Sequence, residues 1–415
     1  MHELLSPVVG EDGAKPSFAW RLFGYPIRMK ITQLSHHVLH VSPKTNWSFI
    51  RVVLDDGLTG WGECTLNGQE RLQREYAAGW SARLAGRVVT GVEAVEALCT
   101  IYPHAPAGLV EHSVKSATEQ ALLDGLAQLR GVPVWALFGP ALRGAVAVYA
   151  NINRATQPRT PQGFAAAAQA AVAAGYRAVK LAPFDGVLPG MAESAEGAAL
   201  IEAALERIRA VRAAIGSGVR LMADCHWRLT PKTARAVLEA LREVDLHWFE
   251  CPLSERASCH DEILALRRLA NAQGVRLAGA EMQTEVEGFR PFIERGLYDT
   301  IMPDAKYCGG IGALLRIAAL AARHGVQTAP HNPSGPIANF ASVQACMVGS
   351  GCDFLELQAG ESPLFGSCVG NAAPVFDAGN FLQPAAAGIG AAVSEAALAA
   401  HPYAPVSGGL DPSLG

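Results

Sequence analysis

Ionisable side chains stand at regular places between residues 180 and 356, each at the end of a short apolar run. They are Lys180, Asp224, His226, Glu250, Glu281, Asp304, His331 and Glu356. A carboxylate or ammonium is costly to bury at the end of an apolar strand unless it has a partner. The pattern therefore predicts one shared site at which the ends of several strands meet.

Three of these side chains are carboxylates that follow neighbouring apolar runs: Asp224, Glu250 and Glu281. Carboxylate oxygens are the ligands that a hard divalent cation such as Mg²⁺ prefers, and three of them leave positions open for water or substrate. For any one of the acids, a salt bridge with an arginine or lysine is the alternative. Three acids in the same position on successive strands favour a metal site.

The remaining groups fit a proton-transfer site beside this metal. Asp304 and His331 follow adjacent runs, where a carboxylate orients an imidazole and raises its basicity, so His331 is a candidate general base. A histidine that only completes the rim is the alternative. His226 comes two residues after Asp224, so strand alternation points both into the site, although His226 could simply hydrogen-bond the ligand carboxylate. Lys180 offers one cation, or else is a solvated lysine.

Eight β-branched or apolar runs alternate with alanine-rich helical stretches and carry these residues. Alternation of this kind over this length predicts a (β/α)₈-type barrel, in which the carboxyl ends of the strands converge on one mouth. No glycine-rich phosphate loop opens the region, which argues against a doubly wound sheet. We assign the barrel to residues 146–358, with runs VAVYANIN, YRAVKLAPF, VRLMADCHW, LHWFECPL, RLAGAEMQ, DTIMPDAKY, GVQTAPHN and DFLELQ.

The flanking segments have different patterns. Residues 27–145 read as an α+β unit, with strands around an Asp55-Asp56-Gly57 turn followed by helices. Residues 1–26 are rich in glycine, proline and charge and predict an N-terminal arm. Residues 359–415, rich in proline, glycine and alanine, are expected to return over the first unit.

Composition excludes several classes of protein. The 415 residues carry a net charge of -4, from 34 basic and 38 acidic residues, without a basic run, so we expect no nucleic-acid and no membrane partner. The nine cysteines are scattered singly, which favours a reducing cytoplasm over a disulfide scaffold. The first residues lack a signal-peptide core, and we expect a soluble, cytoplasmic protein. The apolar content and the arm favour a homo-oligomer.

The order of several motifs resembles the enolase superfamily, specifically the acid-sugar dehydratases of its mandelate racemase-like branch. The resemblance extends from about residue 27 to 375 and rests on GLTGWGE, TEQALLDGLAQLRGVPVWALFG, GYRAVKL, MADCHW, FECPL, AGAEM, MPDAKYCGGI and APHNPSGP. Each motif alone is weak, but their order and spacing are specific. The resemblance implies an enolase-like modified barrel with an α+β capping domain.

Carried over by position, the resemblance also implies roles. Asp224, Glu250 and Glu281 are the Mg²⁺ ligands, Asp304 and His331 form the basic dyad, and Glu356 matches an acid near the substrate carboxylate. Racemases of this branch have Lys-x-Lys on the second strand, whereas this chain has Lys180-Leu181-Ala182. The second base of a racemase is therefore absent.

Further implications concern the dehydratases. Asp224-Cys225-His226 resembles the Asp-x-His of galactonate and mannonate dehydratase-like members, in which the histidine protonates the departing hydroxyl. The capping arrangement implies that Thr45 and Asn67 lie on cap loops that face the barrel mouth and contact substrate. The sequence of these loops does not identify the sugar acid.

These residues, together with the resemblance, predict a Mg²⁺-dependent dehydratase, a carbon–oxygen lyase of carbohydrate-acid catabolism. It would remove the proton next to the carboxylate of an aldonate or aldarate and eliminate the β-hydroxyl, giving a 2-keto-3-deoxy acid. A racemase or epimerase of a 2-hydroxy acid is one alternative, and a non-catalytic sugar-acid-binding relative is another. A metal-dependent hydrolase on the same scaffold would need an early His-x-His pair, which the barrel region lacks.

Overall fold

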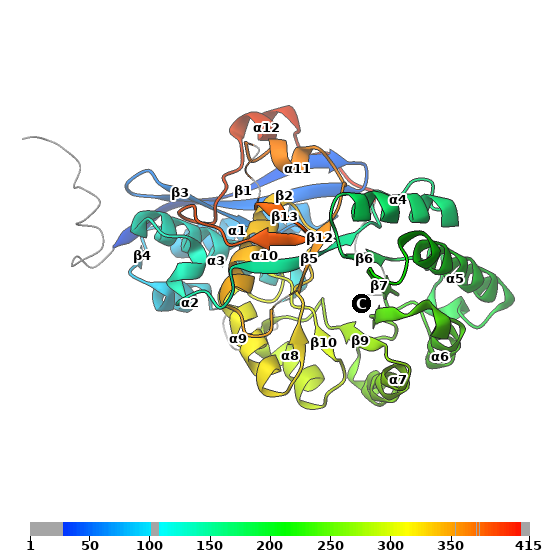
Figure 1. Cartoon of the computed structure of the whole chain (residues 1–415). Coiled ribbons are helices and arrows are strands. Elements are labelled where there is room, and N and C mark those ends of the chain that lie inside the picture. Colours follow the sequence, from blue (N-terminus) through cyan, green and yellow to red (C-terminus); the bar gives the residue numbers. More distant parts are fainter. Residues whose placement is uncertain (1–27, 101–107, 353, 371, 373, 408–415) are drawn as a thin grey trace, which may run out of the picture.

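The computed structural model describes residues 28–100, 108–352, 354–370, 372 and 374–407. The predicted arm, residues 1–26, lies outside the described residues. Figure 1 shows a cap, drawn in blue to cyan, beside a ring of strands and outer helices, drawn in green to orange. The fold class predicted from the sequence, a (β/α)₈-type barrel with an α+β capping domain, is confirmed.

The cap is a four-stranded antiparallel sheet, in the order β3-β2-β1-β4, covered by helices. Its elements are β1 (Met29–Ser42), β2 (Thr45–Leu54), β3 (Thr59–Glu63), α1 (Glu70–Leu84), β4 (Val88–Val89), α2 (Val92–Cys99) and α3 (Leu109–Arg130). Two glycines of β3 let α3 lie directly on the sheet. A Cβ atom on Gly60 or Gly62 would fall 1.9 Å from a carbonyl oxygen of α3, so neither position tolerates a side chain.

The barrel is a parallel sheet with a helix after most of its strands. Its strands are β5 (Ala145–Asn151), β6 (Ala178–Leu181), β7 (Arg220–Asp224), β8 (Leu246–Glu250), β9 (Arg276–Gly279), β10 (Thr300–Ile301), β11 (Gln327–Thr328) and β12 (Phe354–Gln358). Its helices are α4 (Pro161–Ala173), α5 (Ala195–Ile215), α6 (Pro231–Ala240), α7 (His260–Ala272), α8 (Glu285–Glu294), α9 (Ile311–Arg323) and α10 (Pro336–Val348).

The barrel ladder runs from β11 back to β5 and on to β12, which pairs with β5. Among the described residues, β11 and β12 share no ladder. Single backbone hydrogen bonds narrow this gap, from Thr328 N to Gly351 O at 3.3 Å and from Glu356 N to Pro330 O at 3.4 Å. All eight runs predicted as barrel strands form strands; of the two shortest, β11 borders the gap and β10 pairs with β11.

One side chain from each of seven successive strand positions fills the barrel interior. This cluster is separate from the outer core and consists of Tyr149, Ala178, Met222, Trp248, Ala278, Met302 and Ala329. The rings of Tyr149 on β5 and Trp248 on β8 pack edge to face at 5.3 Å, and the alanines on other strands leave room for them in the narrow interior. Because strand side chains alternate, the next inward-facing residue on each strand lies one layer closer to the mouth.

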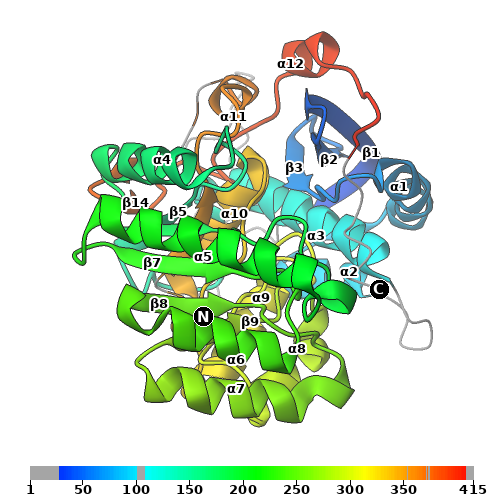
Figure 2. The same ribbon diagram turned by 90° about the vertical axis from the view of Figure 1, so that its right-hand side faces the viewer.

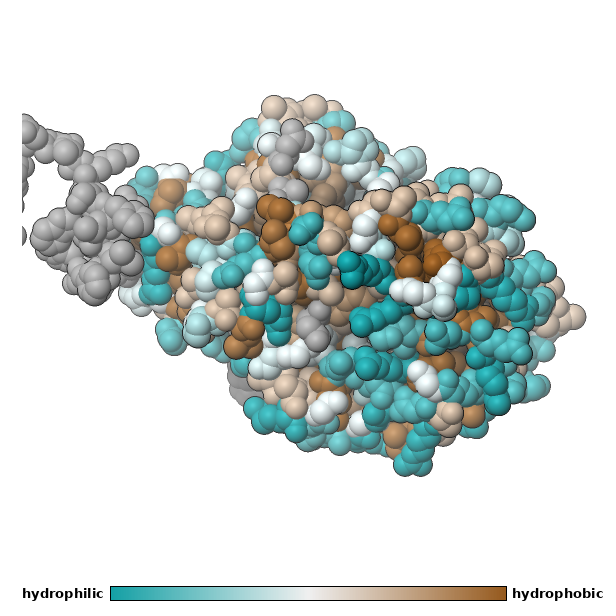
Figure 3. Space-filling view, in the orientation of Figure 1, coloured by the Kyte–Doolittle hydropathy of each residue, from teal (hydrophilic) through white to brown (hydrophobic). Residues whose placement is uncertain are grey.

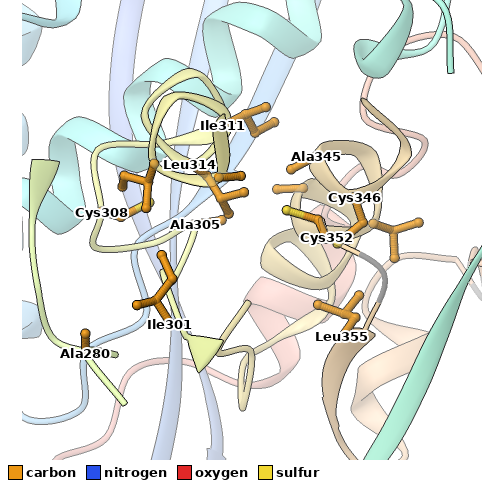
Figure 4. Packing of buried hydrophobic residues seen from close by; sticks show 14 of the residues in the cluster. Ala280, Ile301, Ala305, Cys308, Ile311, Leu314, Ala345, Cys346, Cys352 and Leu355 are labelled. Atoms are coloured by element: carbon orange, nitrogen blue, oxygen red, sulfur yellow. The ribbon is translucent and has the colours of Figure 1, made fainter. Parts of the chain in front are cut away.

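The larger core lies between the strands and the outer helices. Figure 4 shows part of it, where Ile301 and Leu314, from β10 and α9, lie opposite Cys346 and Leu355, from α10 and β12.

All nine cysteines are free thiols, as the sequence indicated. In Figure 3 the surface over the barrel helices is mainly hydrophilic, with only scattered brown patches. No helix of the described residues is long and apolar enough to cross a bilayer.

The C-terminal segment runs back over the cap, as Figures 1 and 2 show for α12. It contains α11 (Leu364–Ser367), the hairpin β13 (Phe376–Asp377) and β14 (Asn380–Leu382), and α12 (Glu395–Ala400). The backbone N–H of His40 in β1 donates to His401 O at 2.9 Å, and the Asn46 amide donates to Ala404 O at 2.9 Å. The domain boundaries at residues 26, 145 and 358 stay predictions.

Candidate active site

Strand alternation brings most of the predicted site residues into one layer. Counting two positions on from the interior cluster gives Asn151, Lys180, Asp224, Glu250, Asp304 and His331, and two positions after Phe354 comes Glu356. Glu281 breaks the count, because it comes three positions after Ala278. Ala280, between them, has φ +70°, and this left-handed residue turns the chain so that Glu281 joins the layer.

The three predicted metal ligands form a buried acidic cluster. One carboxylate oxygen from each of Asp224, Glu250 and Glu281 lies within 4.8 Å of the other two. Burial raises the pKa of Glu250 and of Glu281 well above the usual range, and the neighbouring carboxylates raise both further. Glu281 Oε2 is buried without a hydrogen-bond partner. The cluster is short of positive charge and has a vacant oxygen, which fits a hard divalent cation.

Lys180 is the cation nearest to this cluster. Its Nζ atom lies 2.5 Å from Glu250 Oε1, 2.9 Å from Glu356 Oε1 and 3.7 Å from Asp224 Oδ2, and the side chain is only 1% exposed. Burial alone would lower the pKa of Lys180, but the surrounding carboxylates raise it well above its usual value. Lys180 therefore keeps its charge, and the alternative of a solvated surface lysine is excluded by its burial.

His331 lies between the acidic cluster and Asp304. Its Nδ1 is 2.8 Å from Asp304 Oδ2, and its Nε2 is 3.6 Å from Glu281 Oε2. Burial would raise the pKa of Asp304, but Lys306 and His331 together hold it below its usual range. An ionised Asp304 accepts a hydrogen bond from Nδ1–H of His331, which leaves the Nε2 lone pair directed toward the cluster.

Lys306 is a site residue that the sequence analysis missed. Its buried Nζ lies 2.6 Å from Asp304 Oδ2 and also donates to the Ser334 hydroxyl, while its backbone N–H donates to Asp304 Oδ1 at 2.7 Å. Asp304 therefore has two cationic or proton-donating partners, Lys306 and His331. The spacing could have indicated it, because Lys306 comes two positions after Asp304. Strand β10 ends at Ile301, however, so the alternation of strand side chains does not extend to these two residues.

His226 reaches the site by a different route from the one predicted. Strand β7 ends at Asp224, and His226 and Trp227 both have left-handed backbones, with φ +48° and +57°. The ring lies back over the strand end, with Nε2 2.9 Å from Asp224 Oδ2 and the side chain 35% exposed. Strand alternation was the wrong reason for its position. The contact is the one expected if His226 hydrogen-bonds a ligand carboxylate.

The cap closes the mouth, and Glu63 at the end of β3 joins it to the loop after His331. Its buried carboxylate accepts the backbone N–H groups of Gly335 and Ala338, each at 2.8 Å, at the start of α10. A Cβ on Gly335 would lie 2.8 Å from Glu63 Oε1, so the close approach requires glycine. Burial raises the pKa of Glu63, although these donors and Lys306 oppose the rise.

Two adjoining hollows, which share Asp224 and His226 as lining residues, lie beneath the cap. The inner one, about 170 Å³, is lined by Asn67 together with Lys180, Asp224 and His331. The outer one, about 570 Å³, is lined by Thr45, Arg154 and Glu361, among others. The structure therefore brings both predicted cap residues to the mouth, whereas Glu356 is fully buried beneath it, accepting the Asn151 amide at 2.7 Å and the Asn332 N–H at 3.0 Å.

Comparison with known proteins identifies the family. Residues 163–397 match the family described as Enolase C-terminal domain-like, and residues 26–139 match the mandelate racemase / muconate lactonizing enzyme N-terminal domain. The chain belongs to the enolase superfamily. The mandelate racemase-like branch that the motifs predicted is confirmed.

Curated relatives of this enolase superfamily member include several dehydratases. A D-galactonate dehydratase of Verminephrobacter eiseniae is 30% identical over 311 residues, covering 75% of this chain and 76% of the relative. A D-galactonate dehydratase family member of Streptomyces bingchenggensis is 30% identical over 405 residues, covering 92% and 95%. A D-gluconate dehydratase of Thermoproteus tenax is 29% identical over 305 residues, covering 72% and 58%. The chain is thus a hydro-lyase, the class of carbon–oxygen lyase that the sequence predicted.

Solved structures support the same fold. A mandelate racemase/muconate lactonizing enzyme from Jannaschia sp. CCS1 matches with a TM-score of 0.79 and 25% identity, covering 90% of this chain and 98% of that one. An enzyme of the same description from Sulfitobacter sp. matches with a TM-score of 0.78 and 25% identity, covering 91% and 96%. The cap and the barrel thus occur together in these relatives.

Proposed function

We propose that this enzyme is a Mg²⁺-dependent dehydratase of a sugar acid, an aldonate or an aldarate, and that its product is a 2-keto-3-deoxy acid. One observation carries the proposal. The Nε2 atom of His331 faces the acidic cluster at 3.6 Å from Glu281, while Nδ1 is held by Asp304 at 2.8 Å. A base oriented in this way, next to a charge-neutralising site for a carboxylate, is what removal of a weakly acidic α-proton requires.

The acidic cluster would hold the metal through Asp224, Glu250 and Glu281. Its fit to a divalent cation rests on the vacant Glu281 oxygen and on the excess of buried negative charge. When bound, the ion supplies positive charge that stabilises the negative oxygens of the enediolate form of the substrate. Mg²⁺ is proposed over softer metals because all three ligands are carboxylates.

The side chains of this chain divide the remaining work. His331 removes the C2 proton through Nε2, and the C–H electron pair becomes the double bond between C1 and C2. Lys180, charged and buried, donates to the substrate carboxylate and opposes its growing negative charge. His226, more exposed than His331, donates a proton to the C3 hydroxyl, which leaves as water as the C3–O bond breaks; the C1–C2 electron pair becomes the C2–C3 double bond and the carboxylate re-forms. The enol then ketonises to the 2-keto-3-deoxy acid.

Further proposals concern the setting of the reaction. The names of the curated relatives, D-galactonate and D-gluconate dehydratase, support a sugar acid as substrate for this chain as well. Action in the cytoplasm and assembly as a homo-oligomer are further proposals, and they rest on composition alone.

A racemase or epimerase would need a second base on the opposite face of C2. Ala182 occupies the position at which racemases of this branch carry that lysine, so the proposed reaction uses one base and one acid. A non-catalytic sugar-acid-binding protein would not need the Asp304–His331 pair in this geometry.

The test is a screen of the purified protein with Mg²⁺ against a library of aldonic and aldaric acids. The assay detects 2-keto acids and, by NMR, epimers of the starting acids. Formation of a 2-keto-3-deoxy acid from at least one member supports the proposal. Epimerisation without dehydration would show a racemase, and binding of an acid without any turnover would show a non-catalytic relative.

A further inference from the structure

The outer hollow is where the far end of a substrate must lie. Asp224 and His226 line this hollow and also the inner cavity, so the two spaces adjoin at the site. A sugar acid whose carboxylate lies beside Lys180 extends its carbon chain from the inner cavity into the outer hollow. The groups on the walls of the outer hollow therefore determine which tail the enzyme accepts.

Arg159, one of the cations on these walls, is directed into the protein. It donates from Nε and Nη2 to the two oxygens of Asp185, at 2.7 and 2.8 Å. Three further hydrogen bonds from its guanidinium go to Asn153 and to the carbonyl of Ala182. Arg228 is engaged with the carbonyl oxygen of Val187 at 2.8 Å. These cations stabilise the loops around the hollow through hydrogen bonds to them.

Arg154 is held differently, through a single nitrogen atom. Its Nη1 lies 3.0 Å from both carboxylate oxygens of Glu361, and the Thr45 hydroxyl donates to Glu361 Oε1 at 2.7 Å. The Glu361 side chain is 8% exposed and that of Arg154 is 32% exposed. Among the described residues, Nε and Nη2 of Arg154 donate to no other group, so they are available to a ligand. These three residues, from the cap, the barrel and the C-terminal segment, form what we call the tail clamp.

We propose that the tail clamp of Thr45, Arg154 and Glu361 selects a neutral polyhydroxyl tail, so that the substrate is an aldonate and a dicarboxylic aldarate is rejected. This inference rests on the proposed dehydratase function. A hydroxyl group both donates and accepts, whereas a carboxylate only accepts. Glu361 accepts from a hydroxyl and Arg154 donates to one, and both can do so at once.

The second carboxylate of an aldarate would be repelled by a negative charge in the tail clamp. At Arg154 it would lie beside the carboxylate of Glu361, which is fixed by Thr45 and nearly buried, and like charges placed together at a binding site are strongly unfavourable. Lys44 is a further cation that lines the hollow, but it is exposed, and a solvated ammonium attracts a carboxylate only weakly. The clamp therefore discriminates by repulsion as well as by hydrogen bonding.

The experiment compares kcat/KM for aldonates and for aldarates of the same length and configuration, with Mg²⁺ present. We expect the wild-type enzyme to prefer the aldonate by about 100-fold or more, since like-charge contacts cost several kcal/mol. Glu361→Gln removes the repulsive charge and should narrow this preference by at least about 10-fold, through a gain on the aldarate. Glu395→Gln is the matched control, because its exposed carboxylate pairs with Arg51 on the cap surface, and it should leave the preference unchanged.

The outcomes separate the clamp from the reaction. A wild-type preference for aldarates, or an unchanged preference in Glu361→Gln, overturns the clamp and leaves the dehydratase intact. Failure of the wild type to form a 2-keto acid from any member of either series overturns the dehydratase and the clamp with it. Should Glu361→Gln not fold, Thr45→Val removes only the hydroxyl that fixes Glu361. If the tail clamp acts as proposed, Thr45→Val should narrow the preference for aldonates over aldarates, by less than Glu361→Gln would. An unchanged preference in Thr45→Val refutes the clamp.

Discussion

Glu250→Gln removes one negative charge from the acidic cluster and keeps the shape of the side chain. Coulomb's law with an effective dielectric constant of about 20 gives at least roughly 3 kcal/mol of repulsion for each carboxylate pair, because their nearest oxygens lie within 4.8 Å of one another. Glu250 has two such neighbours. The same expression gives roughly 7 kcal/mol of attraction for Glu250 and Lys180 at 2.5 Å. The opposing contributions nearly cancel, so the free energy of unfolding without metal should change by no more than about 1–2 kcal/mol.

Wild type and Glu250→Gln should differ in how much Mg²⁺ raises their free energy of unfolding. At a Mg²⁺ concentration of 100 times the dissociation constant, binding to the folded state stabilises the wild type by about 2.7 kcal/mol. The variant, with one ligand replaced by an amide, should gain little of this and should lose turnover. Thermal unfolding with and without Mg²⁺, together with 2-keto acid formation, measures both effects.

Glu119→Gln serves as the matched control. Glu119 is also a buried carboxylate, but it accepts the N–H groups of Ile311 and Gly312 at the cap–barrel boundary instead of joining the acidic cluster. This variant should keep the full Mg²⁺-induced stabilisation. If Glu250→Gln shows the same Mg²⁺-induced increase as the wild type, or remains fully active, the metal assignment is wrong.

Two further predictions concern other charges. Lys306→Met removes one of the two partners that keep Asp304 ionised, so kcat should fall by about 10- to 100-fold with little change in KM. As a control, Lys232→Met at an exposed position should leave both constants unchanged. A Lys306→Met variant with the kcat of the wild type would refute the role of Lys306. Burial raises the pKa of Glu119 from 4.5 to about 7, so between these pH values the folded state holds a proton that the unfolded state has lost. Stability should therefore fall by up to about 3 kcal/mol as pH rises from 4.5 to 7, and denaturant titrations at several pH values should show a smaller fall in Glu119→Gln. Identical pH dependence in both proteins would contradict this.

The strands and their polar ends could be predicted because both follow a simple period. Each barrel strand is a short apolar run, and the residue two positions beyond the interior cluster is polar in nearly every strand, as at Lys180 on β6 and Glu250 on β8. Parallel strands that curve into a barrel must bring such residues together, so the acidic cluster followed from sequence order alone.

Residues placed by turns could not be predicted in this way. The position of His226 depends on two successive residues with left-handed backbone conformation. Residues other than glycine rarely adopt this conformation, and no sequence pattern indicated it here. Lys306 lies in the turn after β10, and its contact with Asp304 depends on how that turn folds. Glu361 comes from a segment without periodicity and meets Thr45, more than three hundred residues earlier, only through the return of the chain over the cap.

The most direct test of the proposed chemistry follows deuterium from D₂O into the C2 position of unreacted substrate. If His331 removes the C2 proton and His226 protonates the leaving hydroxyl, the His226→Asn variant should still incorporate deuterium at C2 while it releases little keto acid. The His331→Asn variant should do neither, because Ala182 provides no second base. Exchange that survives the loss of His331 but not the loss of His226 would contradict the assignment of base and acid.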